Sequence, residues 1–210
     1  MKKADAARPH PTPPRRGPPG GGGGGGGGPP PPGTRPTSDR VREALFSSIE
    51  ARMDLDGVRV LDLYAGSGAL GLEALSRGAE AALLVESDRR AAAVLRGNIS
   101  DLGLAAAQVR VGAVAQVLAQ AGAGVFDLVF ADPPYDLPTA AVEADIGALA
   151  AHGWLAGDAL LLVERSIRSA EIAWPAGFAG RAPKRYGETR IESAVYLGTG
   201  AVDSAVPASV

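Results

Sequence analysis

From residue 38 onward, the chain alternates between two patterns of apolar and polar positions. Five short, nearly continuous apolar runs have the length of buried strands: Val58–Tyr64, Ala81–Glu86, Gln108–Val111, Phe126–Ala131 and Ala159–Glu164. The stretches that separate them repeat their apolar residues with helical spacing: Ala69–Arg77, Asp88–Leu102, Val114–Gln120 and Pro138–Ala150. Apolar strands that alternate with amphipathic helices predict a parallel sheet with helices on both faces.

Both ends of this alternating region differ from its middle. An amphipathic helix is predicted to begin at Ser38 or Asp39, either of which can cap it, and to end near Ala51. After the fifth strand, residues 179–186 and 190–197 alternate like two strands joined by a short turn. The sequence therefore predicts a mostly parallel, seven-stranded α/β sheet with an antiparallel C-terminal edge hairpin.

Composition separates the first 36 residues from the rest. They hold 11 of the 29 glycines and 11 of the 17 prolines, including an unbroken run from Gly20 to Gly28. Because such a segment cannot bury a core, we expect residues 1–36 to be disordered, 37–198 to form the catalytic domain and 199–210 to be a flexible tail. Residues 37–210 contain 15 basic and 22 acidic side chains, so nucleic-acid binding would need a local basic patch.

Several classes of chemistry are excluded by the absence of cysteine. No disulfide, thiolate nucleophile or cysteine-ligated metal can form, and methylation of a base carbon through a cysteine adduct is excluded. The two histidines, His10 and His152, lie far apart in the sequence, which argues against a metal site or a histidine-based triad. Without a leader-like or membrane-spanning apolar run, we expect a soluble cytoplasmic protein with no membrane partner and no metal.

A glycine-rich turn follows the first predicted strand. Gly66-Ser67-Gly68-Ala69-Leu70-Gly71 has the GxGxxG spacing of dinucleotide-binding proteins, and Glu86 ends the next strand. A nicotinamide dehydrogenase is therefore one alternative. Asp62, however, precedes the glycines, and its carboxylate would repel a pyrophosphate but attract the sulfonium and amino groups of S-adenosylmethionine.

The candidate cofactor site consists of the residues around this turn and at the ends of the next two strands. Glu86 can accept hydrogen bonds from the ribose hydroxyls of either cofactor. The predicted cofactor-binding residues are Asp62, Tyr64, Ala65, Gly66, Ser67, Gly68, Glu86, Ser87 and Ala113.

A second motif, Asp132-Pro133-Pro134-Tyr135, ends the fourth predicted strand. Asp132 and the Pro133 carbonyl can both accept hydrogen bonds from an exocyclic amino group, which localises its lone pair and directs it at a methyl donor. Pro134 stiffens the loop, and Tyr135 offers a face for base stacking, an interaction of roughly 1–3 kcal/mol in general. These four residues are the predicted catalytic site.

Together, Asp62–Gly68 and Asp132–Tyr135 resemble the cofactor and catalytic motifs of class I amino-methyltransferases, which have a Rossmann-like fold. The segments Arg35–Phe46 and Tyr186–Thr189 narrow the resemblance to the RsmD family, over about residues 33–197. This resemblance implies methyl transfer from S-adenosylmethionine to N2 of guanine 966 in 16S rRNA. It also implies an assembling small ribosomal subunit as the partner and a monomeric enzyme.

Three features depart from that family's pattern. The family opens with a basic β-hairpin where this chain has its Pro/Gly-rich segment. Ala113 replaces a polar residue that is common near the adenine, and Glu188 replaces the usual Asp of a Tyr-Gly-Asp-Thr turn.

Basic residues near both ends of the domain are the candidate RNA contacts. They are Arg35, Arg40, Arg181, Lys184, Arg185 and Arg190. By the same resemblance, Thr37 and Arg40 border the carboxylate of the cofactor. For the terminal cluster, an ordinary solvated face is an equally good interpretation. Two other functions stay open: a DNA adenine-N6 methyltransferase, and a non-catalytic relative that only binds RNA or cofactor.

Overall fold

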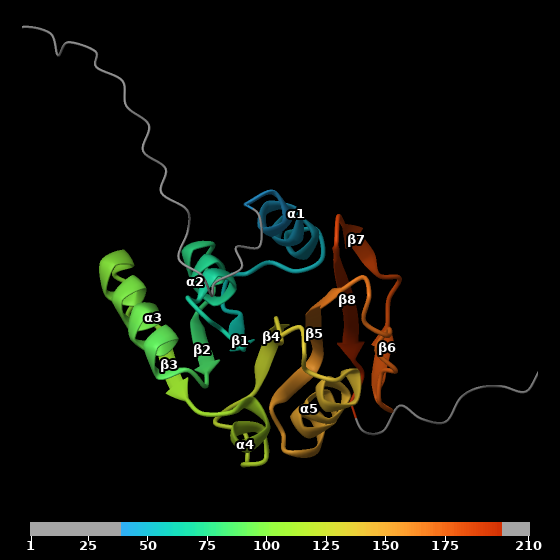
Figure 1. Cartoon of the computed structure of the whole chain (residues 1–210). Coiled ribbons are helices and arrows are strands. Elements are labelled where there is room, and N and C mark those ends of the chain that lie inside the picture. Colours follow the sequence, from blue (N-terminus) through green and yellow to red (C-terminus); the bar gives the residue numbers. More distant parts are fainter. Residues whose placement is uncertain (1–38, 199–210) are drawn as a thin grey trace, which may run out of the picture. The chain divides into compact units, whose positions relative to one another are not determined.

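The computed structural model describes residues 39–198, which form an α/β unit around one central sheet (Figure 1). Its helices are α1 (Asp39–Glu50), α2 (Ala69–Ser76), α3 (Arg89–Leu102), α4 (Val114–Leu118) and α5 (Thr139–Ala151). Its strands are β1 (Arg59–Leu63), β2 (Ala81–Glu86), β3 (Ala107–Val111), β4 (Phe126–Ala131), β5 (Leu155–Ser166), β6 (Phe178–Gly180), β7 (Lys184–Tyr186) and β8 (Thr189–Tyr196).

The strand order places a topological switch point in the middle of the sheet. The order is β3-β2-β1-β4-β5-β8-β6, with β1 to β5 parallel and β8 antiparallel to β5. The chain moves outward from β1 to β3 and then returns to β4 on the other side of β1. Ligands of open α/β sheets bind where the strand order reverses, outside the carboxyl ends of the strands. The carboxyl ends of β1 and β4 are therefore the expected place for a site.

The antiparallel C-terminal edge is confirmed, but the sheet has eight strands rather than seven. The strand predicted over 179–186 is divided into β6 and β7, which pair with opposite ends of β8. Arg181 still donates its backbone N–H to the Ser193 carbonyl at 2.8 Å. Pro183, which has no N–H, stands where the ladder would continue, and β7 begins only after it.

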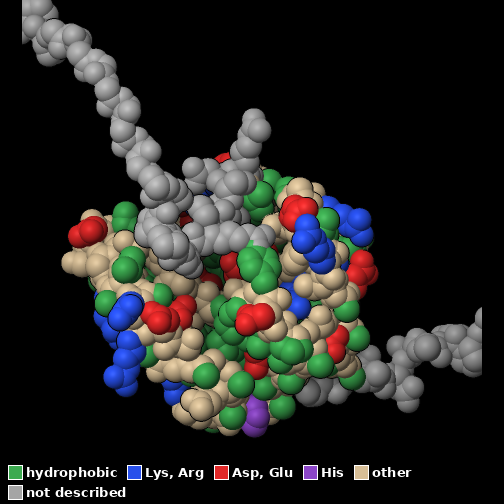
Figure 2. Space-filling model, viewed as in Figure 1, with side chains coloured by type: hydrophobic (Ala, Val, Ile, Leu, Met, Phe, Trp, Pro, Cys, Tyr) green, Lys and Arg blue, Asp and Glu red, His purple; other side chains and the backbone are tan. Residues whose placement is uncertain are grey.

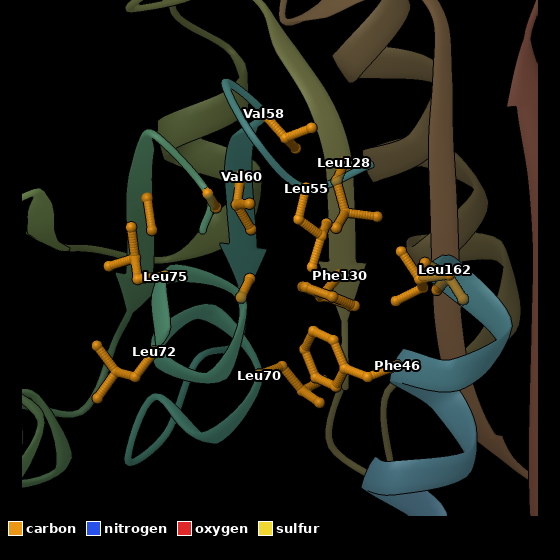
Figure 3. Close-up of a cluster of buried hydrophobic side chains, with 14 of the residues drawn as sticks. Phe46, Leu55, Val58, Val60, Leu70, Leu72, Leu75, Leu128, Phe130 and Leu162 are labelled. Atoms are coloured by element: carbon orange, nitrogen blue, oxygen red, sulfur yellow. The ribbon is translucent and has the colours of Figure 1, made fainter. Parts of the chain in front are cut away.

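Separate apolar cores cover the two faces of the sheet. On one face α1, α2 and α3 pack against the strands, and Phe46 of α1 lies 5.7 Å from Phe130 of β4 between ring centroids (Figure 3). On the other face α4 and α5 enclose a second core, in which Trp154 stacks on Phe126 at 6.1 Å. Because both faces are buried, the central strands β2 and β4 are apolar at nearly every position, as the sequence pattern predicts.

Several sequence-based predictions fall outside the described residues. They are the disorder of residues 1–36, the flexible tail 199–210, and the roles of Arg35 and Thr37; the backbone of Arg40 is in α1, but its side chain is not described. Within residues 39–198, no helix has the length and apolar character that crossing a membrane requires.

Candidate active site

The glycine turn lies between β1 and α2, and hydrogen bonds to side chains of β2 and α3 hold its backbone. Gly66 donates its N–H to Glu86 Oε2 at 2.8 Å, and Asn98 of α3 donates to the Ser67 carbonyl at 2.9 Å. Gly68 has a φ of 85°, and a Cβ there would lie 2.3 Å from Leu95 Cδ1. Only glycine fits at position 68, because a side chain would suffer both backbone strain and a clash.

Asp62 lies in β1 beneath this turn, with only 2% of its surface exposed. Its Oδ2 accepts the Gly71 N–H at 2.8 Å, and a Cβ on Gly71 would lie 3.0 Å from the same oxygen. Burial raises the pKa of Asp62 to about 7; the Gly71 hydrogen bond opposes that rise, and the nearby carboxylates of Asp132 and Glu86 add to it. Since Gly71 lies in the first turn of α2, Asp62 occupies an amide that a pyrophosphate would otherwise use.

Glu86 ends β2, and backbone donors fix both of its carboxylate oxygens. Oε2 accepts from Gly66, while Oε1 accepts the Asp88 N–H at 2.7 Å. Asp88 in turn caps α3 by accepting the N–H groups of Arg90 and Ala91. The carboxylate is thus oriented before any ligand arrives.

The other predicted cofactor residues near Glu86 are exposed or half-buried. Ser87 is exposed and directs its hydroxyl to Glu86 Oε1 at 3.4 Å. Ala113 is exposed and stands at the N-terminal cap position of α4, just after Gly112, whose N–H donates to the Glu86 carbonyl at 3.0 Å. Ala65 and Ser67 are half-buried in the glycine turn. All these positions therefore line the same edge of the sheet as the two carboxylates.

The second motif leaves the sheet immediately beside β1. The Asp132 N–H points to the Leu63 carbonyl at 3.4 Å, which ties the end of β4 to the end of β1. Pro133 is buried, Pro134 is exposed, and Tyr135 is 55% exposed. Farther along the loop, Leu137 donates its N–H to the Pro134 carbonyl at 3.0 Å. The loop is closed on itself and presents an aromatic ring to solvent.

Three acidic side chains thus meet at the carboxyl ends of three neighbouring strands. Asp62 is on β1, Glu86 ends β2, and Asp132 follows β4. The carboxylates of Glu86 and Asp132 lie close enough to Asp62 to raise its pKa. Such a concentration of negative charge with little solvent favours a ligand that carries positive charge. The described residues contain no group of three or more acidic or histidine side chains arranged to hold a metal ion.

Tyr64, a predicted cofactor residue, places its hydroxyl on the opposite face of the sheet. The hydroxyl donates to Asp145 Oδ2 of α5, and burial followed by this hydrogen bond raises the pKa of Tyr64. Burial also raises the pKa of Asp145, against the effect of the Tyr64 bond. The backbone of Tyr64, with a φ of 60°, still belongs to the glycine turn. Only its main chain is therefore available on the ligand side.

The predicted RNA contacts of the C-terminal cluster divide into surface and interior residues. Arg181, Lys184 and Arg185 are exposed, and Lys184 donates to Ser48 Oγ of α1 at 2.8 Å.

The prediction that Arg190 contacts RNA is wrong, because this residue is only 2% exposed. It pairs with Glu192 Oε1 at 2.9 Å and donates to the carbonyls of Ser169 and Ala170. The other oxygen of Glu192 accepts the Ile172 N–H at 2.9 Å. Arg190 thus fastens the segment after β5 to the sheet and cannot reach a phosphate.

Sequence reasoning did not single out three residues that support the site. Asn98 holds the glycine turn, Asp145 holds Tyr64, and Arg165 of β5 donates to the Leu137 carbonyl at 3.1 Å and to Thr139 Oγ1 at 3.2 Å. The sequence signal for Asn98 and Asp145 is a polar residue on a helix beside apolar neighbours. Arg165 directly follows an apolar run and could have been read as its solvent-facing end.

The architecture resembles solved methyltransferase structures. A putative methyltransferase from Escherichia coli, yhhF, superimposes with a TM-score of 0.71 and 35% identity, over 80% of this chain and 90% of that one. The fold and the three-carboxylate site define the protein as a Rossmann-like methyltransferase.

Residues 28–195 match the family described as Conserved hypothetical protein 95, and the chain belongs to that family. Ribosomal RNA small subunit methyltransferase D of Escherichia coli K12 is 42% identical over 147 residues, covering 70% of this chain and 72% of the relative. The Haemophilus influenzae protein of the same name is 36% identical over 141 residues, covering 63% and 68% respectively. These matches confirm the family resemblance that the sequence motifs predict.

Proposed function

We propose that this chain transfers a methyl group from S-adenosylmethionine to the exocyclic N2 of guanine 966 in 16S rRNA. The observation that carries the proposal is the meeting of Asp62, Glu86 and Asp132 at the switch point of the sheet. The names of the two relatives, both ribosomal RNA small subunit methyltransferases, support rRNA as the substrate class.

The residues of the first two strands fit a cationic methyl donor. The donor supplies an electrophilic methyl group on a positively charged sulfur. Glu86, oriented by Gly66 and Asp88, accepts hydrogen bonds from ribose hydroxyls. Asp62 contributes negative charge beneath the turn, where burial strengthens its attraction for a cation. Ala113 offers only backbone groups to an adenine amino group.

The Asp132–Tyr135 loop acts on the acceptor. Asp132 and the Pro133 carbonyl accept the hydrogens of N2, which localises the lone pair of the amine and aims it at the methyl carbon. The new N–C bond forms as the S–C bond breaks, and N2 then loses a proton, which the Asp132 carboxylate accepts. Pro134 limits the motion of the loop, and the exposed ring of Tyr135 stacks on the extruded base.

The proposed substrate also implies where the protein works and what it contacts. We propose that the protein works in the cytoplasm, as a monomer, on an assembling small ribosomal subunit. Exposed Arg181, Lys184 and Arg185 supply phosphate contacts on the subunit, and Arg35 and Arg40 are proposed to do the same at the other end of the domain.

The direct test is transfer of a tritiated methyl group to small subunits from cells that lack this modification, followed by nucleoside analysis. The expected product is N2-methylguanosine at a single position, with no label on subunits that already carry the modification. Label in N6-methyladenine of duplex DNA would instead support a DNA methyltransferase. Tight uptake of NAD with no heat of binding for the methyl donor would contradict the proposal at the level of the cofactor.

A further inference from the structure

An open groove of about 670 Å³ extends from the catalytic loop, and Tyr135 is its one lining residue with a role in the chemistry described above. Its lining comes from three segments: Tyr135 of the catalytic loop, the turn after β5, and the turn between β7 and β8. The lining residues are Tyr135, Ser166, Arg168, Ser169 and Glu188. The groove therefore begins at the aromatic ring beside Asp132 and runs toward the β7 and β8 end of the sheet, at the right of Figure 1.

Backbone hydrogen bonds fix the walls of this groove. Ile167 donates its N–H to the Glu188 carbonyl at 3.0 Å, which joins the two turns. Within the turn after β5, the Arg168 N–H reaches Ser166 Oγ at 3.2 Å, and the Ser169 N–H reaches the Ser166 carbonyl at 3.1 Å. The main chain that presents Arg168 is thus held in place against the turn that carries Glu188.

The two charged side chains of the groove, Arg168 and Glu188, form an exposed ion pair. Arg168 Nη2 lies 3.1 Å from Glu188 Oε2, and the two side chains are 78% and 71% exposed. Exposed ion pairs of this kind stabilise a fold by roughly 0–1 kcal/mol, so Arg168 can exchange its partner for another anion at little cost. A guanidinium suits a phosphate particularly well, because its planar donors match two phosphate oxygens.

An aromatic face followed by an exchangeable arginine matches the chemistry of a single nucleic-acid strand, whose bases stack while its phosphates pair with cations. We propose that this groove binds the RNA strand next to the target nucleotide, with Arg168 exchanging Glu188 for a backbone phosphate. Glu188 is then a competing anion that the RNA displaces. This inference rests on the proposed function, because it assumes an RNA substrate.

The experiment compares Arg168→Gln and Glu188→Gln with the unmodified protein, using unmethylated small subunits as substrate. Arg168→Gln should raise the KM for the subunits about tenfold and lower the slope of log KM against log salt concentration by about one, since one phosphate contact is lost. Glu188→Gln should lower the KM, because Arg168 no longer has a competing anion. The kcat and the affinity for the methyl donor should stay unchanged in both variants.

The matched control is Arg96→Gln, which replaces another exposed arginine, on α3 beside the opposite end of the sheet. If Arg96→Gln and Arg168→Gln change the KM and the salt slope equally, the groove is not the binding site. A higher KM for Glu188→Gln would refute the exchange of partners. In both of these cases the unmodified protein still methylates and the proposed function stands. An unmodified protein without activity on the subunits refutes both proposals.

Discussion

At the scale of single residues, the protonation of Asp62 links the site to pH. Its pKa of about 7 means that the buried carboxyl is close to half protonated at neutral pH. A cationic ligand favours the ionised form and lowers the pKa, so binding should release a proton. Below pH 7 the ligand must also displace that proton, and its affinity falls.

The first prediction concerns this pH dependence. Affinity for S-adenosylmethionine should decrease as the pH falls from about 8 to about 6, and Asp62→Asn should bind weakly with much less dependence on pH. Isothermal titration calorimetry in buffers of different ionisation enthalpy measures both the affinity and the proton release. Equal pH dependence in the two proteins would contradict the role of Asp62.

The second prediction concerns the stability of the ligand-free protein, to which Asp62 contributes more at low pH than at high pH. In the folded protein its pKa of about 7 lies well above that of an ordinary aspartate, so its contribution to stability is present below about pH 4 and is lost as the pH rises through 7. Asp62→Asn removes a buried charge while its amide oxygen can still accept the Gly71 N–H. We expect this variant to have a higher Tm than the unmodified protein at about pH 8 and a smaller difference at about pH 5. A lower Tm at both pH values would show that the asparagine is not tolerated.

The third prediction separates the two other carboxylates. Asp132→Ala should lower kcat by at least about 100-fold with little change in the affinity for the methyl donor, because Asp132 acts on the acceptor amine. Glu86→Ala should mainly weaken donor binding. Equilibrium binding and single-turnover rates at saturating donor distinguish the two, and equal losses of binding would refute these separate roles.

The sequence identifies these three acids because each lies at or near the end of an apolar run, and because Asp62 precedes a glycine-rich turn while Asp132 precedes two prolines. It does not identify the true role of Arg190, since counting basic residues near a turn says nothing about which side chains point inward. The i and i+2 spacing of Arg190 and Glu192 within a buried strand is the signal for their internal pair. Side-chain partners from distant elements, such as Asn98 for Ser67, depend on packing and cannot be read from a local pattern.

At the scale of elements, β2 and β4 have the predicted bounds, because each is an apolar run between clear turn residues. Strand β5 is longer than predicted and begins at Leu155 rather than Ala159. Gly157 and Asp158 indicate a turn in the sequence, and Asp158 does adopt a φ of 63°, yet the strand continues through it beside an irregular register with β4. Turn-forming residues within a strand can thus mark a bulge instead of its end.

The fourth prediction concerns Arg165, which holds the loop between β4 and α5. Arg165 contacts the Leu137 carbonyl, and its Nε has no hydrogen-bond partner within the described part of the chain. Arg165→Met should lower kcat about tenfold, because the catalytic loop loses an anchor, while the affinity for the methyl donor is unchanged. The Tm should be maintained, since methionine fills the space without a buried charge.

The control for Arg165 is Thr139→Val, which removes its other hydrogen bond but leaves the Leu137 contact. We expect this variant to keep nearly full activity. Unchanged kcat in Arg165→Met, measured with saturating donor and subunits, would show that the loop needs no anchor from β5.

At the scale of the whole molecule, charge is distributed in separate groups. Figure 2 shows basic side chains in separate places on the visible face, with acidic side chains between them. The chain as a whole carries a net charge of −2, so RNA affinity must depend on a few local contacts rather than on a general attraction.

The fifth prediction tests one of those contacts. Arg185 is exposed on β7, and Arg185→Glu should raise the KM for small subunits and reduce the salt slope by at least about one, with the affinity for the methyl donor unchanged. Kinetic measurements over a series of salt concentrations provide the slope. An unaltered slope would remove the β7 surface from the RNA interface.

The division of the edge strand at Pro183 has a consequence for how copies of the protein meet. A long, continuous outer strand offers a row of unpaired N–H and C=O groups to any other extended chain, which promotes aggregation. Here β6 and β7 contain three residues each, and the proline between them cannot donate at all. Neither piece offers a foreign strand enough consecutive partners to extend the sheet, so the described edge strands are themselves a barrier to strand pairing between copies of the protein.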